Sequence, residues 1–355
     1  SPGRAAPPLP RHSPRRRVDP RDTDLAHFRR CVEVSYSSWT GEEFTSVGRL
    51  AKSIHGEVRF LKPANGGPNV VAKVVPNEAV DRSQNKECNE RLMWLGTKES
   101  AVVEDLASEI AILSHLQRSP LEPCPYVVKL LGVFHDAAST YLLTEYCQGG
   151  DVFDRVSSGA QMPEEEKKRY MSQLLQAVRH MHDRNVGHRD VSLENMVLRN
   201  NEHSGHDCVL MDFGQAVRLR AMDGTVLRYF AEAGKRMYRA PEMHVPRLRS
   251  IQVICPSDGA GGSITQVTYD RSRCEVLLPP GASPGRPCFA EPYGYAAAPA
   301  DVFACGVCAF VLSIGKPPWQ SARDCDPTFS FVRRHGVATL LKQWRGSPNA
   351  PAGEE

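Results

Sequence analysis

The stretch His188-Arg-Asp-Val-Ser-Leu-Glu-Asn195 decides the interpretation of this chain. It places an aspartate, Asp190, five residues before an asparagine, Asn195, in a predicted loop between a helix and a short strand. Transfer of a phosphoryl group needs a carboxylate that accepts the proton of the attacking hydroxyl, and an oxygen ligand for magnesium. The stretch supplies both groups, so Asp190 is the candidate base and Asn195 a candidate metal ligand.

Two further motifs follow this loop in order along the chain. Asp212-Phe-Gly214 begins seventeen residues after Asn195, and Ala240-Pro-Glu242 begins 28 residues after Asp212. Either tripeptide alone would be a chance match, but three motifs in order at workable spacing argue against coincidence. Asp212 is therefore the predicted second magnesium ligand.

The rest of the chain has the pattern of a small sheet followed by a helical region. Residues 46–76, 127–133 and 140–146 have strand patterns, and apolar residues recur at helical spacing from Leu106 to Leu116. Helices predominate from Pro163 onward, beginning with a periodic segment over 164–182. A tract rich in glycine, proline and serine then interrupts this region over about 245–299, and it has mostly loop composition.

With these motifs the chain resembles the eukaryotic protein kinase superfamily over about residues 45–340. The resemblance implies a bilobal α+β fold, with a small antiparallel sheet and one main helix in the amino-terminal lobe and a mostly helical carboxy-terminal lobe. The expected division is a disordered leader (1–30), the first lobe with its hinge (31–147), the second lobe (148–346) with an insertion at about 245–299, and a disordered tail (347–355).

The resemblance assigns ATP and Mg²⁺ as cofactors and gives two residues a role on the phosphates. Lys73, in Val71-Ala-Lys73, would hold the α- and β-phosphates, with Glu109 as its partner on a helix. Two alternatives stay open: Lys73 as a strand-edge lysine, and Glu104 or Asp105 in place of Glu109. The spacing of the apolar residues after Glu109 favours Glu109.

The adenosine side of the site is implied in the same way. Thr144 resembles the gatekeeper, and the hinge that follows would bond adenine through the backbone of Glu145 and Cys147. Asp151 would contact the ribose. Asp301 resembles the buried aspartate that pins the catalytic loop in this family.

The predicted phosphate-covering loop departs from the family pattern of three glycines. It reads Ala51-Lys-Ser53-Ile-His-Gly56-Glu-Val58, so only the third glycine is present. Glycine lets backbone N–H groups approach a phosphate without interference from a Cβ atom. Ala51 and Ser53 should therefore loosen the cradle, unless the loop lies elsewhere.

A second departure concerns a pair of positions around the catalytic aspartate. Most serine/threonine kinases have lysine two residues after that aspartate and Gly-Thr in the later segment, whereas this chain has Ser192 and Gly234-Lys235. One hypothesis is that the two have traded places, so that Lys235 supplies the catalytic ammonium and Ser192 the hydroxyl. The alternative is that Lys235 is an exposed lysine of the activation segment.

With these departures from the general pattern, the chain resembles the apicomplexan FIKK kinases over about residues 33–345. The chain also has Lys73-Val-Val-Pro76, and Trp39-Thr-Gly41-Glu-Glu-Phe44 is similar to the tryptophan-bearing lead-in of that family. The string that names the family is not intact, because Val71-Ala-Lys73-Val stands in its place. The resemblance implies a parasite serine/threonine kinase, often exported or tied to the cytoskeleton.

The segment between Asp212 and Glu242 also bears on regulation and on closure of the second lobe. Arg189 is a position that pairs with an activation-loop phosphate in related kinases, and Thr225 and Tyr229 are candidate phosphosites. Glu242 needs an arginine partner, for which Arg345 is available. We expect the last two helices of the family fold to be missing and the lobe therefore to be truncated or closed differently.

The amino-acid composition limits the binding partners and the cellular compartment that we expect for this chain. The 355 residues carry a net charge of +3, and residues 1–30 hold eight arginines against three aspartates, so this leader is either solvated or contacts acidic partners. No run of about 18 apolar residues is present, so no transmembrane segment is expected. Cys305 and Cys308 are predicted to be core residues, which favours a reducing, cytoplasm-like environment, while export stays open. Protein substrates, no nucleic acid and a monomer are expected.

Three functions are compatible with these motifs. The favoured one is an ATP-dependent protein kinase that phosphorylates serine or threonine. A pseudokinase scaffold is supported by Ala51, Ser53 and Ser192, but Lys73 and Asp190 argue against it because both catalytic groups are present. A small-molecule phosphotransferase is disfavoured by Ala240-Pro-Glu242, which belongs to a peptide-docking segment.

Overall fold

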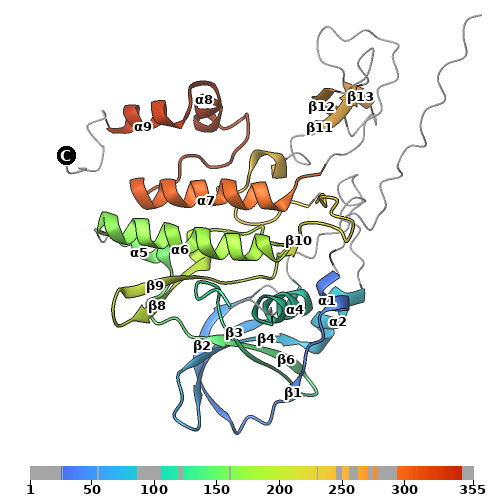
Figure 1. The fold of residues 1–355 in the computed structure, drawn as a ribbon, viewed down its shortest axis with the longest axis vertical. Coiled ribbons are helices and arrows are strands. Elements are labelled where there is room, and N and C mark those ends of the chain that lie inside the picture. Colours follow the sequence, from blue (N-terminus) through green and yellow to red (C-terminus); the bar gives the residue numbers. More distant parts are fainter. Residues whose placement is uncertain are drawn as a thin grey trace, which may run out of the picture.

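The computed structural model describes residues 25, 27–53, 56–85, 105–118, 123–159, 161–229, 231–244, 250–255, 263–270, 275–277 and 294–345. Within these ranges a sheet with one long helix forms one lobe, and a group of helices forms the other (Figure 1). The expected bilobal α+β fold is confirmed.

The amino-terminal lobe is built on a six-stranded sheet. Its spatial order is β1 (Ser37–Ser38), β5 (Leu130–His135), β6 (Ser139–Glu145), β4 (Val70–Pro76), β3 (Glu57–Pro63) and β2 (Phe44–Lys52). Only the pairing of β1 with β5 is parallel among these strands. Successive residues of a strand point to opposite faces, so Leu142 joins the core under α4 while Tyr141 stacks on Trp39 at 4.3 Å.

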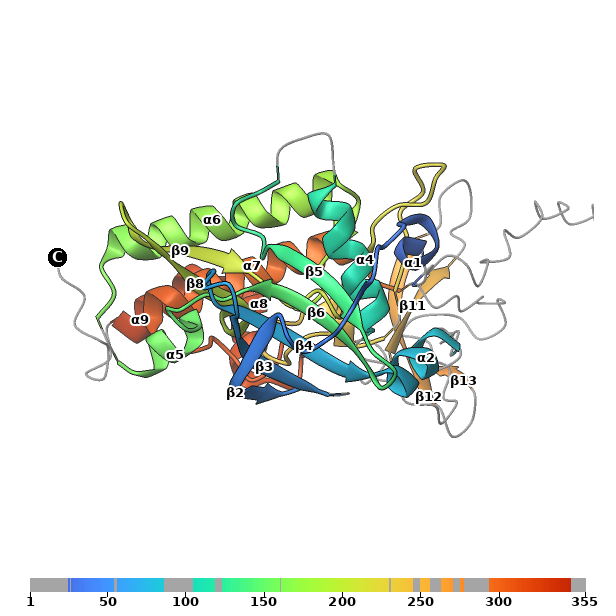
Figure 2. The same cartoon turned by 90° about the horizontal axis from the view of Figure 1, so that it is seen from below.

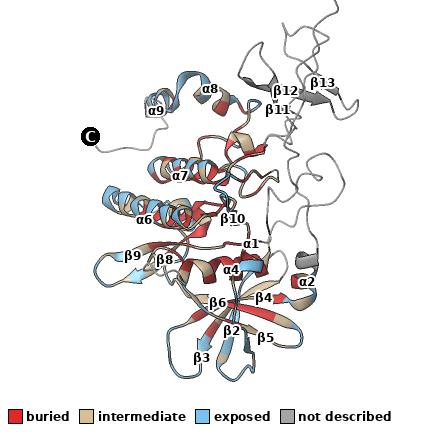
Figure 3. Cartoon of the chain, turned by 45° about the vertical axis from the view of Figure 1, so that its right-hand side comes forward, coloured by how far each residue is buried: buried red, intermediate tan, exposed pale blue. Residues whose placement is uncertain are grey.

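Helix α4 (Leu106–Gln117) covers one face of this sheet, as Figure 2 shows. Asp105 caps its amino terminus by accepting a hydrogen bond from the Ala107 amide at 3.1 Å. Ten of its twelve residues are buried, and the burial colours of Figure 3 show the helix deep in the lobe. The predicted apolar face from Leu106 to Leu116 is confirmed, and it fixes the position of Glu109.

The carboxy-terminal lobe is mainly helical. Its elements are α5 (Val152–Ser157), α6 (Glu164–Asp183), β7 (Val186–Gly187), the 3₁₀ turn η2 (Leu193–Asn195), β8 (Met196–Asn201), β9 (Gly205–Leu210), β10 (Val217–Arg218), η3 (Pro241–His244), α7 (Ala297–Ile314), α8 (Pro327–His335) and α9 (Val337–Arg345). Strand β8 pairs with β9, and β7 pairs with β10. Helices α6 and α7 pack side by side, and the β8–β9 hairpin lies on the other side of α6 (Figure 1).

Helix α7 is the one described helix that is long and apolar enough to cross a membrane, with a mean hydropathy of 1.9 over 18 residues. More than half of it is buried inside the lobe, which is the usual condition of a core helix. Cys305 and Cys308 lie on its buried side with free thiols, so the prediction that they are core residues is confirmed.

The assignment of residues 1–30 to a disordered leader is wrong at its carboxy-terminal end. Residues His27–Cys31 form a short helix, α1, that packs on α4. Phe28 is 4% exposed, and Arg29 forms an ion pair with Asp105 at 2.9 Å. Burial of this one aromatic side chain gives the segment a folded position that arginine and proline content did not reveal.

Three strands are described within the predicted insertion, and its mostly loop character stays a prediction because most of its other residues lie outside the described part. Residues Ser250–Cys255 (β11), Ser263–Asp270 (β12) and Glu275–Leu277 (β13) form a three-stranded antiparallel sheet. The upper bound of 299 is too high, because Tyr295 is buried and α7 already begins at Ala297. The insertion therefore ends before Tyr295.

Helices α8 and α9 after α7 were not predicted. Asp326 caps α8 by accepting hydrogen bonds from the Thr328 and Phe329 amides, and Pro327 occupies its first turn. Phe329 is buried and meets the ring of Trp319 at 5.0 Å. The second lobe thus continues as helix to residue 345. Helix α2 (Asn77–Asn85) completes the described helices, beside β4 in the first lobe.

Candidate active site

The buried carboxylate of Asp301 fixes the position of the catalytic loop. Asp301 on α7 is 1% exposed and accepts hydrogen bonds from the backbone amides of His188 at 2.8 Å and Arg189 at 2.7 Å. It also lies 2.9 Å from Nε2 of His182. Arg189 adopts a φ of 67°, an uncommon conformation for a residue other than glycine. The charged acceptor stabilises this turn, and the turn presents Asp190 to the cleft.

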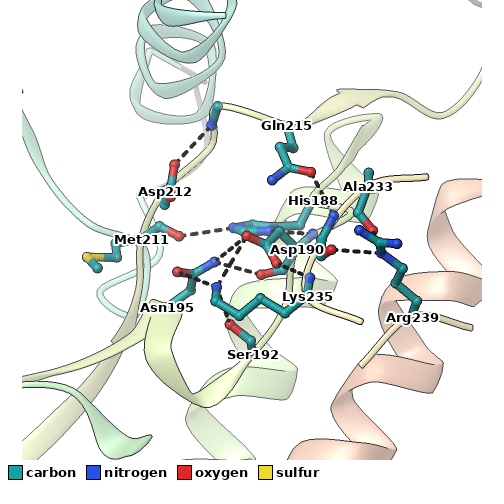
Figure 4. Close-up of polar contacts among 12 residues, drawn as sticks. His188, Asp190, Ser192, Asn195, Met211, Asp212, Gln215, Ala233, Lys235 and Arg239 are labelled. Carbon is teal, nitrogen blue, oxygen red and sulfur yellow. Dashed lines mark hydrogen bonds and ion pairs between the residues drawn. The ribbon is translucent and has the colours of Figure 1, made fainter. Parts of the chain in front are cut away.

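Asp190 and Asn195 lie next to each other, as their spacing predicts. The Asn195 side-chain amide donates to the backbone carbonyl of Asp190 at 2.8 Å and to its Oδ2 atom at 3.0 Å. The Asn195 Oδ1 atom remains free of these bonds and faces the Lys235 ammonium (Figure 4). The carboxylate of Asp190 is thereby held in one orientation.

Lys235 comes from the activation segment, residues 212–242, and reaches this pair. Its ammonium lies 2.9 Å from Ser192 Oγ, 3.2 Å from Asn195 Oδ1 and 3.3 Å from Asp190 Oδ2 (Figure 4). Its backbone amide also donates to Asp190 Oδ1 at 3.0 Å. The side chain is 34% exposed, so it is neither buried nor pointing away into solvent. The structure thus brings the two predicted exchange positions into contact.

Gly234 allows the backbone of the activation segment to come this close. Its φ is +74°, and a Cβ atom there would stand 2.5 Å from the carbonyl oxygen of Arg189. The Gly234 amide donates to Gln215 Oε1 at 2.7 Å, and the Arg239 guanidinium donates to the carbonyl oxygens of Ala233 and Gly234. Gln215 and Arg239 were missed in the sequence analysis, since only their backbone partners reveal their role.

Lys73, Glu109 and Asp212 meet on the opposite side of the cleft. The Lys73 ammonium lies 2.8 Å from Glu109 Oε2 and 3.6 Å from Asp212 Oδ1. The Glu109 side chain is only 5% exposed. Of the alternatives left open, Asp105 is instead the cap of α4, and Glu104 lies outside the described residues.

Asp212 combines an unusual backbone with a perturbed carboxylate. Its φ is 64°, and the next residue, Phe213, is buried against His188 with ring centroids 4.9 Å apart. Burial alone would raise the pKa of the Asp212 carboxyl, but the charge of Lys73, followed by His188 and Lys235, lowers that pKa. Asp212 is therefore held as an anion.

The donor set facing the cleft fits magnesium. The carboxylate of Asp212 and the amide oxygen of Asn195 are hard oxygen ligands, which Mg²⁺ prefers. One or two carboxylate or amide ligands are sufficient, because Mg²⁺ completes its shell with water and substrate phosphates.

The predicted phosphate loop is the turn between β2 and β3. Ala51 pairs with Val58, and the Ser53 amide donates to the Gly56 carbonyl at 3.0 Å, while residues 54 and 55 lie outside the described part. The buried Ser53 hydroxyl has no hydrogen-bond partner among the described residues. A Cβ atom at Gly56 would collide with the Val74 carbonyl, so packing onto β4 already explains this glycine.

The predicted hinge lies at the end of β6. The Glu145 carboxylate faces Lys129 and Arg199, accepting from the Lys129 amide at 2.9 Å and lying 3.3 Å from the Arg199 guanidinium. Burial, with a smaller contribution from Glu145, raises the pKa of the Cys147 thiol to about 12. Asp151 caps α5 by accepting from the Asp154 amide at 2.7 Å. Thr144 pairs with Val71, two residues before Lys73.

Glu232 forms the ion pairs that are described near the end of the activation segment, and the expected Glu242–Arg345 contact stays a prediction. The carboxylate of Glu232 lies 3.4 Å from the Arg323 guanidinium and 2.5 Å from that of Arg239. The side chain of Arg345 lies outside the described residues. An acid of the activation segment is therefore joined to the α7–α8 connection through Arg323.

Comparison with known proteins identifies the family. The protein kinase domain family model matches residues 55–251, which is more than half of the chain. The serine/threonine-protein kinase DCLK3 of Mus musculus is 38% identical over 243 residues, covering 68% of this chain and 23% of that protein. Aurora kinase A-A of Xenopus laevis is 30% identical over 207 residues, covering 54% of this chain and 47% of that protein. The chain belongs to the protein kinase family, and it spans less than half the length of these relatives.

Proposed function

We propose that this chain is an active kinase that transfers the γ-phosphate of ATP to serine or threonine residues of protein substrates. The observation that supports this most is the Lys235 ammonium, which lies within 3.3 Å of Asp190, Ser192 and Asn195. A scaffold without catalysis has no need of a cation held at the catalytic carboxylate. The relatives are named as serine/threonine kinases, which supports the same acceptor class.

In this proposal Asp190 orients the substrate hydroxyl and accepts its proton as the oxygen attacks the γ-phosphorus. Lys235 stands beside Asp190 and neutralises negative charge on the transferring phosphoryl group. Ser192 accepts a hydrogen bond from the Lys235 ammonium at 2.9 Å, and this bond keeps the ammonium from moving closer to the Asp190 carboxylate. Lys235 and Ser192 thus perform the roles of the lysine and the hydroxyl residue in related kinases, but each stands at the position where the other is expected.

The nucleotide would be held from the other side of the cleft. Lys73, oriented by Glu109 at 2.8 Å, would bind the α- and β-phosphates. Asn195 and Asp212 would hold Mg²⁺, which would neutralise phosphate charge when bound. The backbone of Glu145 and Cys147 would bond adenine, Asp151 would approach the ribose, and the Ala51–Val58 turn would cover the phosphates with its Ser53 hydroxyl.

We further propose that the chain belongs to the FIKK subfamily, as the exchanged lysine and the lead-in suggest. Trp39 supports this, because its ring stacks between Tyr141 at 4.3 Å and Phe44 at 5.5 Å. The lead-in then forms part of the catalytic domain. A Trp39→Ala variant tests this point: its melting temperature should fall by roughly 5 °C or more, and an unchanged value would count against it.

A nucleotide-binding scaffold is the second candidate. It is supported by the single remaining glycine of the phosphate loop, since the absent Cβ of Gly56 is explained by packing against Val74 rather than by a phosphate. The two candidates differ in one respect, because only the kinase transfers phosphate.

The test is transfer of radiolabelled phosphate from ATP and magnesium to a generic protein substrate, with Asp190→Asn beside the unaltered chain. Label on serine or threonine that disappears in the Asp190→Asn variant supports the kinase. Absence of transfer, with ATP still raising the melting temperature, would favour the scaffold instead.

A further inference from the structure

The Arg189 side chain contacts Gln215, Tyr229 and Tyr295 in the place where related kinases commonly bind a phosphate of the activation segment. Its Nε atom donates to the Gln215 carbonyl at 2.8 Å, and its Nη1 atom donates to the Tyr295 hydroxyl at 3.3 Å. Its guanidinium carbon also lies 5.0 Å from the centre of the Tyr229 ring, within cation–π range. Protein groups therefore already stabilise this cation.

Two of these partners form a clamp across the activation segment. Tyr229 and Tyr295, the tyrosine clamp, are 0% and 3% exposed. Their backbones exchange two hydrogen bonds of 2.9 and 2.8 Å, so each residue pins the other as in a short antiparallel ladder. Tyr295 follows the insertion and directly precedes α7, an element of the lobe core. The clamp thus ties the middle of the activation segment to that core.

The hydroxyl groups of the clamp are engaged as well. The Tyr229 hydroxyl donates to the Arg218 carbonyl at 2.6 Å, and the Tyr295 hydroxyl donates to the Ala231 carbonyl at 2.8 Å. A phosphate on Tyr229 would bring two charges into a buried site beside a carbonyl oxygen, which is unfavourable. The clamp is therefore incompatible with phosphorylation of Tyr229.

The clamp is linked to the catalytic lysine by a short path. Ala231 lies four residues before Lys235, and between them the Gly234 amide is bound by Gln215, whose carbonyl also holds Arg189. Around this path lies a separate buried cluster that includes Leu227, Tyr229, Ala233 and Tyr295. Burial orders this part of the activation segment, so no added charge is needed to order it.

We propose that Tyr295 is a positioning residue for phosphoryl transfer, and that it replaces an activation-segment phosphate as the partner of Arg189. Through Ala231 and Arg189 it holds the segment in the geometry that delivers Lys235 to Asp190. The chain then needs no phosphate on Thr225 or Tyr229 for full turnover. This inference rests on the proposed kinase activity.

The experiment uses the full chain, treated with a protein phosphatase that is then removed, with dephosphorylation verified by mass spectrometry. Initial rates of substrate phosphorylation are measured within a time too short for autophosphorylation to recover. The expected result is that the treated and untreated chains have the same kcat. Tyr295→Phe keeps the ring and the backbone pairing but removes the hydroxyl, and it should lower kcat about tenfold with little change in KM for ATP. Tyr36→Phe, at an exposed tyrosine of the first lobe, is the matched control.

A double-variant cycle separates positioning from a general structural effect. If Tyr295 acts through Lys235, Tyr295→Phe should cost little further activity in a Lys235→Ala background. Loss of turnover on phosphatase treatment would overturn the proposal, and so would a Tyr295→Phe variant with unchanged kcat or with fully additive loss. An untreated chain with no transfer at all would instead show that the proposed function has failed.

Discussion

The Lys235 ammonium donates a hydrogen bond to Ser192 Oγ at 2.9 Å, so the activation segment supplies a cation to the catalytic loop. The expected arrangement in the family is the reverse, with the lysine on the loop and the hydroxyl on the segment. An exchange preserves the charge at the reaction centre but makes it depend on the position of the activation segment. Order in that segment and catalysis are then coupled through one side chain.

Replacement of Lys235 by alanine should reduce kcat by about 10²–10³-fold, because a preorganised cation at the developing charge is removed. KM for ATP should change by less than about threefold, since Lys73 still holds the nucleotide. Steady-state kinetics of the Lys235→Ala variant measure both quantities. Lys342→Ala, an exposed lysine on α9, is the control. Unchanged turnover in Lys235→Ala would eliminate the exchange hypothesis.

Glu109→Gln should raise KM for ATP about tenfold, which corresponds to ~1.4 kcal/mol. The neutral amide no longer balances the Lys73 charge at 2.8 Å, and Lys73 can turn toward Asp212, which lies at 3.6 Å. Glu202→Gln, at an exposed position of the β8–β9 turn, is the matched control for kinetics against ATP concentration. Equal KM values in the two variants would contradict the assigned pairing.

Asp301→Asn should lower the free energy of unfolding by about 3 kcal/mol. The carboxylate accepts from the His188 and Arg189 amides and lies beside His182, and an asparagine must present an NH₂ group to one of these donors. Urea unfolding measures the loss, with Asp183→Asn on the exposed side of α6 as control. A variant as stable as the control would show that the loop is fixed by other contacts.

The Cys147 thiol should resist alkylation in the folded chain. Its pKa is raised to about 12 by burial, so at pH 8 almost none of it is the reactive thiolate. The raised pKa moves formation of the thiolate to higher pH, so the reactive fraction stays small until the pH approaches 12 and decreases further as the pH falls. Peptide mapping after brief iodoacetamide treatment should find label on the exposed Cys31 and Cys325 long before Cys147. Equal labelling would mean that the hinge is more open than the structure indicates.

The spacing of Asp190 and Asn195 in the sequence predicted that they lie side by side, because both belong to one short loop whose turn sets their distance. Asp190 and Asn195 are joined by bonds across five residues, and these bonds follow from the local turn. Lys235 was predicted only as one of two alternatives, since its distance from Asp190 depends on the path of the whole activation segment. Gln215 could not be identified from sequence, because its contribution is one acceptor for a distant backbone amide.

The parts of the fold that were missed had signals of differing strength. The insertion strands 250–255 and 263–270 alternate and are rich in β-branched residues, so a strand prediction was available despite the flanking glycines and prolines. Asp326-Pro327 is an ordinary helix-start signal for α8. Helix α1 is different, because its five residues have a stable position only through the tertiary burial of Phe28.

In the proposed mechanism the catalytic cation has moved from the catalytic loop to the activation segment. The most direct measurement is kcat for Lys235→Thr, Ser192→Lys and the double variant carrying both changes. Each single variant should lose most activity, the first by removing the cation and the second by crowding two ammonium groups. The double variant, which restores the expected family arrangement, should recover at least about tenfold over Lys235→Thr. A double variant no more active than the single variants, or a Lys235→Thr variant with full turnover, would contradict the claim.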